Sequence, residues 1–202
     1  MPTKSVGESL QQARYTIDPI TLREVVTNKA VVEARIVELE DLGESGDAER
    51  ISWLRILGRL QEAEDLSWYM LVKSGGASDT RQITDPLPYN AVTAALRLAH
   101  VLHWQQRYSH AIQLFSAALG TAESAVSDPD KSQSIALTLV AFARQHLGKM
   151  YFDQGRFEEA LESFQSALNL RQEMKSPEDQ IESTLQAIST TKACIAKNGA
   201  TS

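Results

Sequence analysis

Three histidines have the types and spacing that could bind a metal ion. His100 and His103 are three residues apart and would share one face of a helix, and His146 falls at the corresponding level of a later helix. Three imidazoles that converge in this way could ligate Zn²⁺. No acidic or cysteine ligand is placed to complete the site, and solvated histidines are common on helices. We therefore expect no metal site.

Paired carboxylates are the second pattern that could support chemistry. Glu158, Glu159 and Glu162 cluster in this way, but they fall on the exposed side of a predicted helix, which indicates a solvated face. The chain has no Gly-rich phosphate loop, no G-x-S-x-G, no H-E-x-x-H and no paired cysteines. Its one cysteine, Cys194, excludes an intramolecular disulfide. We expect neither an enzyme nor a cofactor.

The overall charge limits the possible partners. A net charge of −6 and a pI of about 5.3 argue against a general nucleic-acid binder, which needs a basic face. The centre is the least acidic region, because residues 92–154 contain five basic and four acidic residues and every histidine. No apolar run approaches the ~18 residues that span a bilayer, and the first residues are polar. We expect a cytoplasmic protein that binds neither nucleic acid nor membrane.

The elements that must position these residues are clearest in the segment Leu147–Leu170. We expect a helix that ends near Gln154, a turn at Gly155-Arg156 and a second helix that starts near Phe157. Apolar residues in the second helix recur three and four apart and so form one stripe: Phe157, Ala160, Leu161, Phe164, Ala167 and Leu168. Small residues stand where the two helices must approach closely, at Gly148, Ala160 and Ala167.

This segment resembles a tetratricopeptide (TPR) repeat. Leu147-Gly148 and Tyr151 match the pattern of the first helix of that family, and the pattern of the second helix is matched by Ala160, Phe164 and Ala167. Similar turns precede it at 106–111 and 58–63, with alanines spaced by 48 and 49 residues. The usual TPR period is about 34 residues, so the excess lengthens each helix by roughly two turns. The resemblance implies an all-α, right-handed α-α superhelix, a TPR-like solenoid of long helices.

Proline placement predicts where helices begin. Four prolines follow a capping oxygen: Asp18-Pro19, Asp85-Pro86, Asp128-Pro129 and Ser176-Pro177. The predicted helices are 19–42, 47–57, 59–74, 87–105, 107–126, 130–154, 156–174 and 177–197, with a short helix at 5–15. They define an N-terminal helical segment (1–43), three helix pairs (about 44–85, 86–127 and 128–176), and a capping helix with its tail (177–202).

The resemblance also implies where a partner binds. In TPR arrays the first helices of successive pairs form a concave wall, and partners usually lie along it. The candidate groove residues carried over onto this chain are Arg97, His100, His103, Trp104, Phe142, Gln145, His146 and Lys149. Four of them form a mildly basic strip that would prefer an acidic peptide or a chain-terminal carboxylate, and Trp104 and Phe142 could supply apolar anchors.

Structural interpretations of the same residues stay open. Trp104 could cover the adjacent turn, Phe142 could pack under the preceding helix, and Arg97 and Lys149 could be solvated charges. The function we favour is a non-catalytic scaffold or adaptor that binds a protein or peptide. The alternatives are a TPR-type sensory regulator that binds a small peptide or metabolite, and a self-assembling structural protein. The expected helix 19–42 could mediate homo-oligomers, because Val25, Val32 and Leu39 are spaced by seven.

Overall fold

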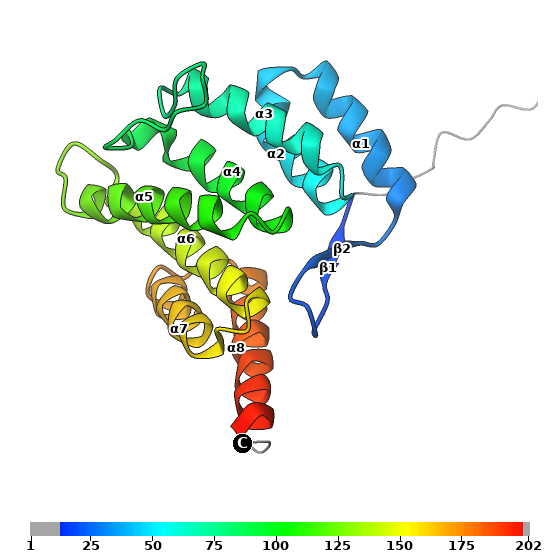
Figure 1. Cartoon of the computed structure of the whole chain (residues 1–202), viewed down its shortest axis with the longest axis vertical. Coiled ribbons are helices and arrows are strands. Elements are labelled where there is room, and N and C mark those ends of the chain that lie inside the picture. The colour runs from blue at the N-terminus through cyan, green and yellow to red at the C-terminus, as the bar shows by residue number, and fades with distance from the viewer. Residues whose placement is uncertain (1–12, 200–202) are drawn as a thin grey trace, which may run out of the picture.

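The computed structural model describes residues 13–199 and confirms an all-α solenoid, to which a small hairpin is added (Figure 1). The helices are α1 (Lys29–Asp41), α2 (Glu44–Ile56), α3 (Leu60–Lys73), α4 (Val92–Trp104), α5 (Tyr108–Val126), α6 (Gln133–Asp153), α7 (Phe157–Glu173) and α8 (Glu178–Gly199). A 3-10 turn, η1 (Tyr89–Ala91), leads into α4, and the strands are β1 (Tyr15–Ile17) and β2 (Glu24–Val26). No helix within residues 13–199 is long and apolar enough to cross a membrane.

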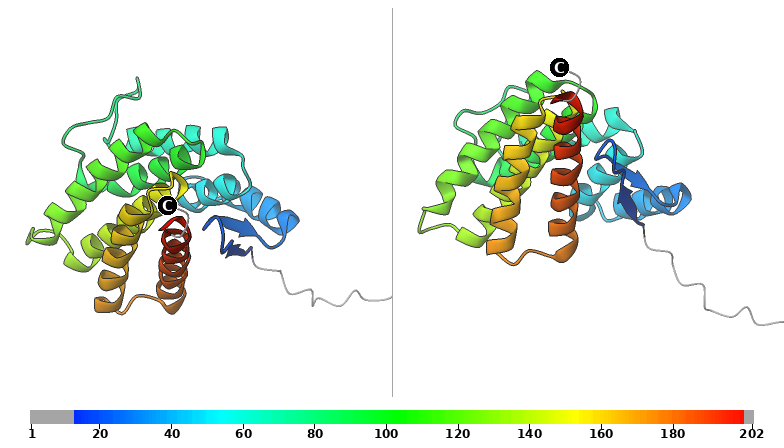
Figure 2. Two further views of the ribbon diagram at one scale, coloured as in Figure 1. Left: turned by 60° about the horizontal axis from the view of Figure 1, so that its bottom comes forward. Right: turned by 90° about the horizontal axis from the view of Figure 1, so that it is seen from below.

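Each helix packs against the next along a curved path. Pairs α2/α3, α4/α5 and α6/α7 follow one another, and α8 covers α7. The hairpin formed by β1, β2 and their connection lies on the inner side of this curve (Figures 1 and 2). We call the sides of α2, α4, α6 and α8 that are turned toward it the inner face.

The three repeated turns share one backbone conformation. Gly58, Gln106 and Gly155 all have positive φ, between 60° and 80°. In each turn the following arginine donates its backbone N–H, at 2.9 Å, to a carbonyl five residues earlier, which closes the end of the preceding helix. The middle turn does so with a glutamine, although glycine adopts this conformation at less cost. The three turns that were aligned by sequence therefore also share one backbone structure.

Gly148 lets α6 approach α7 closely. A Cβ atom at this position would lie 2.6 Å from the ring of Phe164, which is fully buried. The ring fills the space that a side chain at Gly148 would occupy, and Ala160 and Ala167 are buried in the same region. The small residues of the sequence pattern thus stand at a close approach of helices, where larger ones would force them apart.

The expected helix 19–42 is wrong over residues 19–28. Residues 15–26 form an antiparallel hairpin, and α1 starts only at Lys29, where Asn28 caps it by accepting from the backbone N–H groups of Ala30 and Val31. Asp18-Pro19 lies in the hairpin turn, where the Asp18 carboxylate accepts two backbone N–H groups and so mimics a helix cap. Most of the predicted helix 5–15 lies outside the described residues, and Tyr15 belongs to β1.

The second half of the hairpin follows a period of two, because Leu22 and Glu24 are buried while Val25 of β2 is exposed. Val32 and Leu39, the remaining members of the seven-residue spacing, are buried against α2 and α3 within the same chain. The proposed dimer stripe therefore does not exist as one exposed helix face. Helix α4 also begins later than predicted, after η1, and α6 begins at Gln133.

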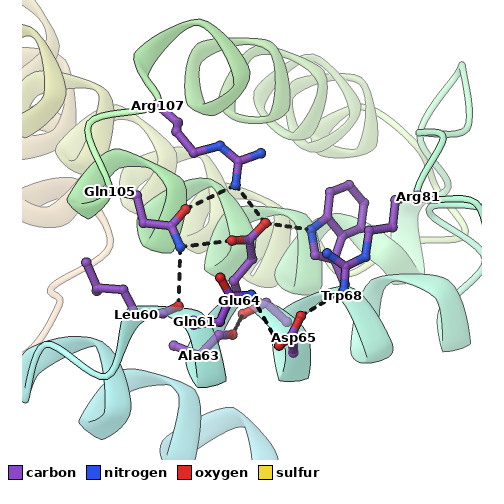
Figure 3. Close-up of polar contacts among 10 residues, drawn as sticks. Leu60, Gln61, Ala63, Glu64, Asp65, Trp68, Arg81, Gln105 and Arg107 are labelled. Atoms are coloured by element: carbon purple, nitrogen blue, oxygen red, sulfur yellow. Dashed lines mark hydrogen bonds and ion pairs between the residues drawn. The ribbon is translucent and has the colours of Figure 1, made fainter.

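A buried carboxylate joins the first helix pair to the second. Glu64 of α3 accepts hydrogen bonds from Gln105 Nε2 (2.9 Å), Arg107 Nη1 (2.7 Å) and Trp68 Nε1 (3.2 Å) (Figure 3). Burial opposes ionisation, but these three donors together lower the pKa of Glu64 below its usual range. The arrangement fixes the turn after α4 onto α3.

Candidate functional site

Two cavities lie between the hairpin and the inner face. The α2–α4–α6 cavity has a volume of about 430 Å³ and is lined by those helices together with Tyr15 and Glu24. The β1–α6–α8 cavity has a volume of about 880 Å³ and extends along the other side of the hairpin. Both include Phe142 and His146, so the hairpin divides what would otherwise be one groove.

Glu24 is the acidic group at the centre of the inner face. It is 8% exposed, and its carboxylate accepts from Arg55 Nη1 at 3.1 Å and from Lys149 Nζ at 3.0 Å. Burial disfavours the charged carboxylate, but the two cations outweigh burial and hold the pKa of Glu24 well below its usual range. Burial likewise lowers the pKa of Lys149, and Glu24 opposes that effect. Lys149 is therefore already paired inside the chain.

The hairpin is anchored to the C-terminal half of the solenoid. Arg23 pairs with Asp153 at 2.6 Å, and Leu22 is buried among side chains of α6, α7 and α8. Thr190 of α8 donates its hydroxyl to the Pro19 carbonyl at 3.0 Å. The hairpin thus bridges from α2, through Arg55, to α8.

Arg97 is the cation of the α2–α4–α6 cavity that lacks an acidic partner. Its guanidinium donates to the carbonyls of Ala48 (3.3 Å) and Thr93 (3.4 Å), and no carboxylate within residues 13–199 forms an ion pair with it. Burial lowers the pKa of Arg97, and no acidic group in the described part of the chain acts to raise it. Glu49 lines the same cavity but is engaged by Arg35 at 3.0 and 2.9 Å. An additional anion near Arg97 would relieve this imbalance.

Aromatic rings in contact, tilted by about 50° to each other, connect α4 to α6 beside this cation. The His100 and His146 ring centroids are 3.9 Å apart, and Phe142 lies 4.2 Å from His146. Both histidines are buried, and His100 Nε2 and His146 Nδ1 have no hydrogen-bond partner among the described residues. Burial is the main reason that the pKa of each lies well below 6.5, so both rings are neutral at pH 7.

The structure distributes the eight candidate residues unequally. Six of them line a cavity: Arg97, His100, Phe142, Gln145, His146 and Lys149. The other two, His103 and Trp104, line neither cavity and pack against side chains of neighbouring elements. His103 is buried and contacts Asp153 at 3.0 Å, while Trp104 is covered by the guanidinium groups of Arg23 (5.1 Å) and Arg55 (4.6 Å). Among residues 13–199 no three histidine, cysteine or acidic side chains are arranged to hold a metal ion.

Glu24 and Tyr15 line these cavities but were not among the candidates, because the hairpin was predicted as a helix. A signal for them was present in the sequence. Residues 15–17 and 24–26 are rich in β-branched and aromatic side chains, and Asp18-Pro19 between them is a turn signal.

Comparison with protein families gives a match to the middle of the chain. The tetratricopeptide repeat profile aligns with residues 90–173, from the 3-10 turn before α4 to the end of α7. These residues match the tetratricopeptide repeat family. The TPR match confirms the predicted resemblance and contains all eight candidate residues, whereas the hairpin, α1–α3 and α8 lie outside it. A search of curated proteins found no match to the chain.

TPR repeats generally serve protein–protein interaction or scaffolding and are typically non-catalytic. The match indicates a general class of function, whereas a specific ligand depends on the side chains of the site.

Proposed function

We propose that this chain is a non-catalytic adaptor that binds a peptide segment of another protein. In this proposal the α2–α4–α6 cavity receives an acidic side chain or a chain-terminal carboxylate of that segment. Arg97 is the observation that carries the proposal, because it is a partly buried guanidinium in a cavity with no acidic partner among the described residues. A carboxylate there gains a charge-assisted hydrogen bond in a site of reduced dielectric.

The remainder of the cavity suits the body of such a ligand. Ile51, Trp53, Leu96 and Leu139 contribute apolar walls, and Phe142 is 36% exposed at the boundary with the second cavity. An apolar pocket with one charged group that fixes orientation is the usual composition of a specific binding site. Because the hairpin blocks the groove at Glu24, this cavity favours a side chain or a terminus over a peptide that runs through.

Arg97→Glu is the direct test, with Arg144→Glu as the matched control. Arg144 lies on α6, where it pairs with Glu123 outside both cavities. Random peptides displayed with free C-terminal carboxylates would be selected on the wild-type chain, and affinities would be measured by fluorescence anisotropy. We expect selected peptides to carry an acidic group and to lose at least about tenfold in affinity with Arg97→Glu but not with Arg144→Glu. Peptides that bind all three proteins equally would refute the assignment.

A small carboxylate is a second candidate ligand, because a volume of about 430 Å³ lies within the range of small-molecule pockets. It would make the chain a sensory regulator. The two possibilities separate in the same experiment: a regulator would bind free organic acids in an Arg97-dependent manner and enrich no peptide.

Charge reversal at Lys149 is not an equivalent test. Its ammonium group is buried on Glu24, so reversal would place two carboxylates together and destabilise the fold.

A further inference from the structure

Within residues 13–199, one edge of strand β1 is not paired with another strand. It pairs with β2 so that Thr16 lies opposite Val25, and the flanking backbone bonds join Asp18 to Arg23 and Thr27 to Arg14. Because hydrogen-bonded and non-hydrogen-bonded pairs alternate in an antiparallel ladder, Thr16 bonds to β2 while its two neighbours direct their N–H and C=O groups away from it. Those neighbours are Tyr15 and Ile17, whose outward groups form no backbone hydrogen bond with another strand within residues 13–199.

This edge faces the β1–α6–α8 cavity. The Ile17 carbonyl accepts a long hydrogen bond, 3.4 Å, from Gln186 of α8, which shows the direction in which the edge points. Neither backbone group of Tyr15 has a partner within residues 13–199. Every residue of β1 lines the cavity, and its volume of about 880 Å³ lies within the range that holds ligands. The edge is therefore recessed beside free space.

Gln145 provides a second, independent indication of a ligand. Its side chain is 3% exposed and lines the same cavity, yet neither Oε1 nor Nε2 has a hydrogen-bond partner among the described residues. A buried amide without hydrogen-bond partners is unfavourable, because it loses its bonds to water and gains none in return. One acceptor and one donor on a single side chain match the N–H and C=O groups that an extended chain presents along each edge.

The charges of the cavity favour recognition of backbone. Three basic residues (Arg14, Lys149, Arg171) and three acidic residues (Glu24, Asp179, Glu182) line it, so it has no net preference for an anion or a cation. Lys149 is, moreover, already paired with Glu24. A second copy of this chain fits poorly as the occupant, because its own β1 edge is recessed in the same way and two such edges cannot meet.

We propose that an extended segment of a partner protein binds in the β1–α6–α8 cavity as a third strand. One edge of that segment pairs with Tyr15 and Ile17, and its other edge bonds to the Gln145 amide. The side-chain bond from Gln186 is replaced by a backbone N–H of the segment. This is strand addition, in which backbone bonds supply affinity. The proposal rests on the proposed function only in requiring a peptide partner, since it concerns a different cavity.

Gln145→Met is the decisive variant, because methionine has nearly the same shape and no strong hydrogen-bonding group. Short random peptides would be selected on the wild-type chain and their affinities compared with those for Gln145→Met and for Arg144→Met, the neighbouring residue outside the cavity. We expect at least about a tenfold loss for the former and no change for the latter. The fold should survive, because the Gln145 amide makes no hydrogen bond within residues 13–199 that the substitution would remove.

Amide hydrogen exchange by NMR then tests the geometry with a selected peptide. The Tyr15 and Ile17 amide protons should become protected on binding, while that of Thr16 is already bonded in the free protein and serves as the reference. N-methylation at every second residue of the peptide should abolish binding, because the N–H groups of those residues face β1. Peptides that bind without protecting Tyr15 and Ile17 would overturn the strand assignment.

The two proposals can fail separately. Peptides lost with Arg97→Glu but retained by Gln145→Met would support the proposed function and overturn this inference. The reverse pattern would support strand addition and overturn the role of Arg97. Selection of no peptide at all would overturn both, and protection of Tyr15 that depends only on protein concentration would replace the partner segment with a second copy.

Discussion

Acidification should destabilise this protein through two buried histidines. The rings of His100 and His146 contact each other at a tilt, and the ring nitrogens without partners among the described residues cannot gain a proton favourably. Burial lowers the pKa of both most strongly, and nearby positive charges act in the same direction: Arg55 on His100 and Lys149 on His146. Glu24 opposes this effect at His146 only in part. The folded chain keeps these rings neutral where the unfolded chain protonates them.

The direction and size of this change in stability follow from the linkage between proton binding and folding. A histidine whose folded pKa is lowered contributes stability that is present above its unfolded pKa, about 6.5, and is lost as the pH falls below that value. Between about pH 7.5 and 5.5 each ring that stays neutral in the fold should cost roughly 1.4 kcal/mol, or about 3 kcal/mol for both. The free energy of unfolding of a typical domain is only about 5–15 kcal/mol. Glu24 should not contribute in this window, because its pKa lies far below it.

Urea unfolding followed by far-ultraviolet circular dichroism would measure this dependence. The wild-type chain, a His100→Leu/His146→Leu double variant and a His110→Leu control would be compared at the two ends of the pH window. His110 is exposed on α5, so its substitution should leave the dependence intact. The double variant should retain only the smaller contribution of His103, whose pKa burial lowers and Asp153 partly restores. A wild-type free energy of unfolding that changes by less than about 1 kcal/mol would refute the reasoning.

Three further predictions concern stability, each measured by thermal or urea unfolding. Gly148→Ala should destabilise the fold by about 1–3 kcal/mol, because the added methyl group would clash with Phe164. Gly120→Ala on α5, where the surrounding space is open, should stabilise the fold by up to about 1 kcal/mol. Similar effects of both substitutions would contradict the argument that α6 and α7 approach closely at Gly148. Gln106→Gly should stabilise by about 0.5–1 kcal/mol by relieving its positive φ, and a loss would show that the side chain matters more. Glu24→Ala should destabilise by about 3–5 kcal/mol, because two buried cations lose their partner, and a neutral result would mean that water solvates them.

The sequence predicted the solenoid where local and tertiary signals agree. From α4 to α7 the stripe of apolar residues, the small residues at close approaches and the repeated turns all specify the same helix pairs. The turn at Gln106 was located although it lacks glycine, because the arginine and alanine that follow keep their spacing.

The hairpin was missed because two periods coincide there. Leu22, Val25 and Val26 satisfy helical spacing, while Leu22 and Glu24 satisfy the strand spacing that the structure uses. Burial of Glu24 could not be inferred from a local pattern, because its two cationic partners lie 31 and 125 residues away. For the same reason Lys149 looked like a free groove cation, although it is paired within the chain.

The contacts of the hairpin also bear on how this array comes apart. In an ordinary solenoid each repeat touches only its neighbours, so the ends can fray independently and folding can propagate from any repeat. Here the bond from Thr190 to Pro19 spans 171 residues, and Arg23 reaches Asp153 across 130. These contacts connect the N-terminal hairpin to the C-terminal helices, so that unfolding of either end of the array should destabilise the other end. Insertion of one more helix pair, a change that open arrays tolerate, would separate the hairpin from α8 and break these contacts.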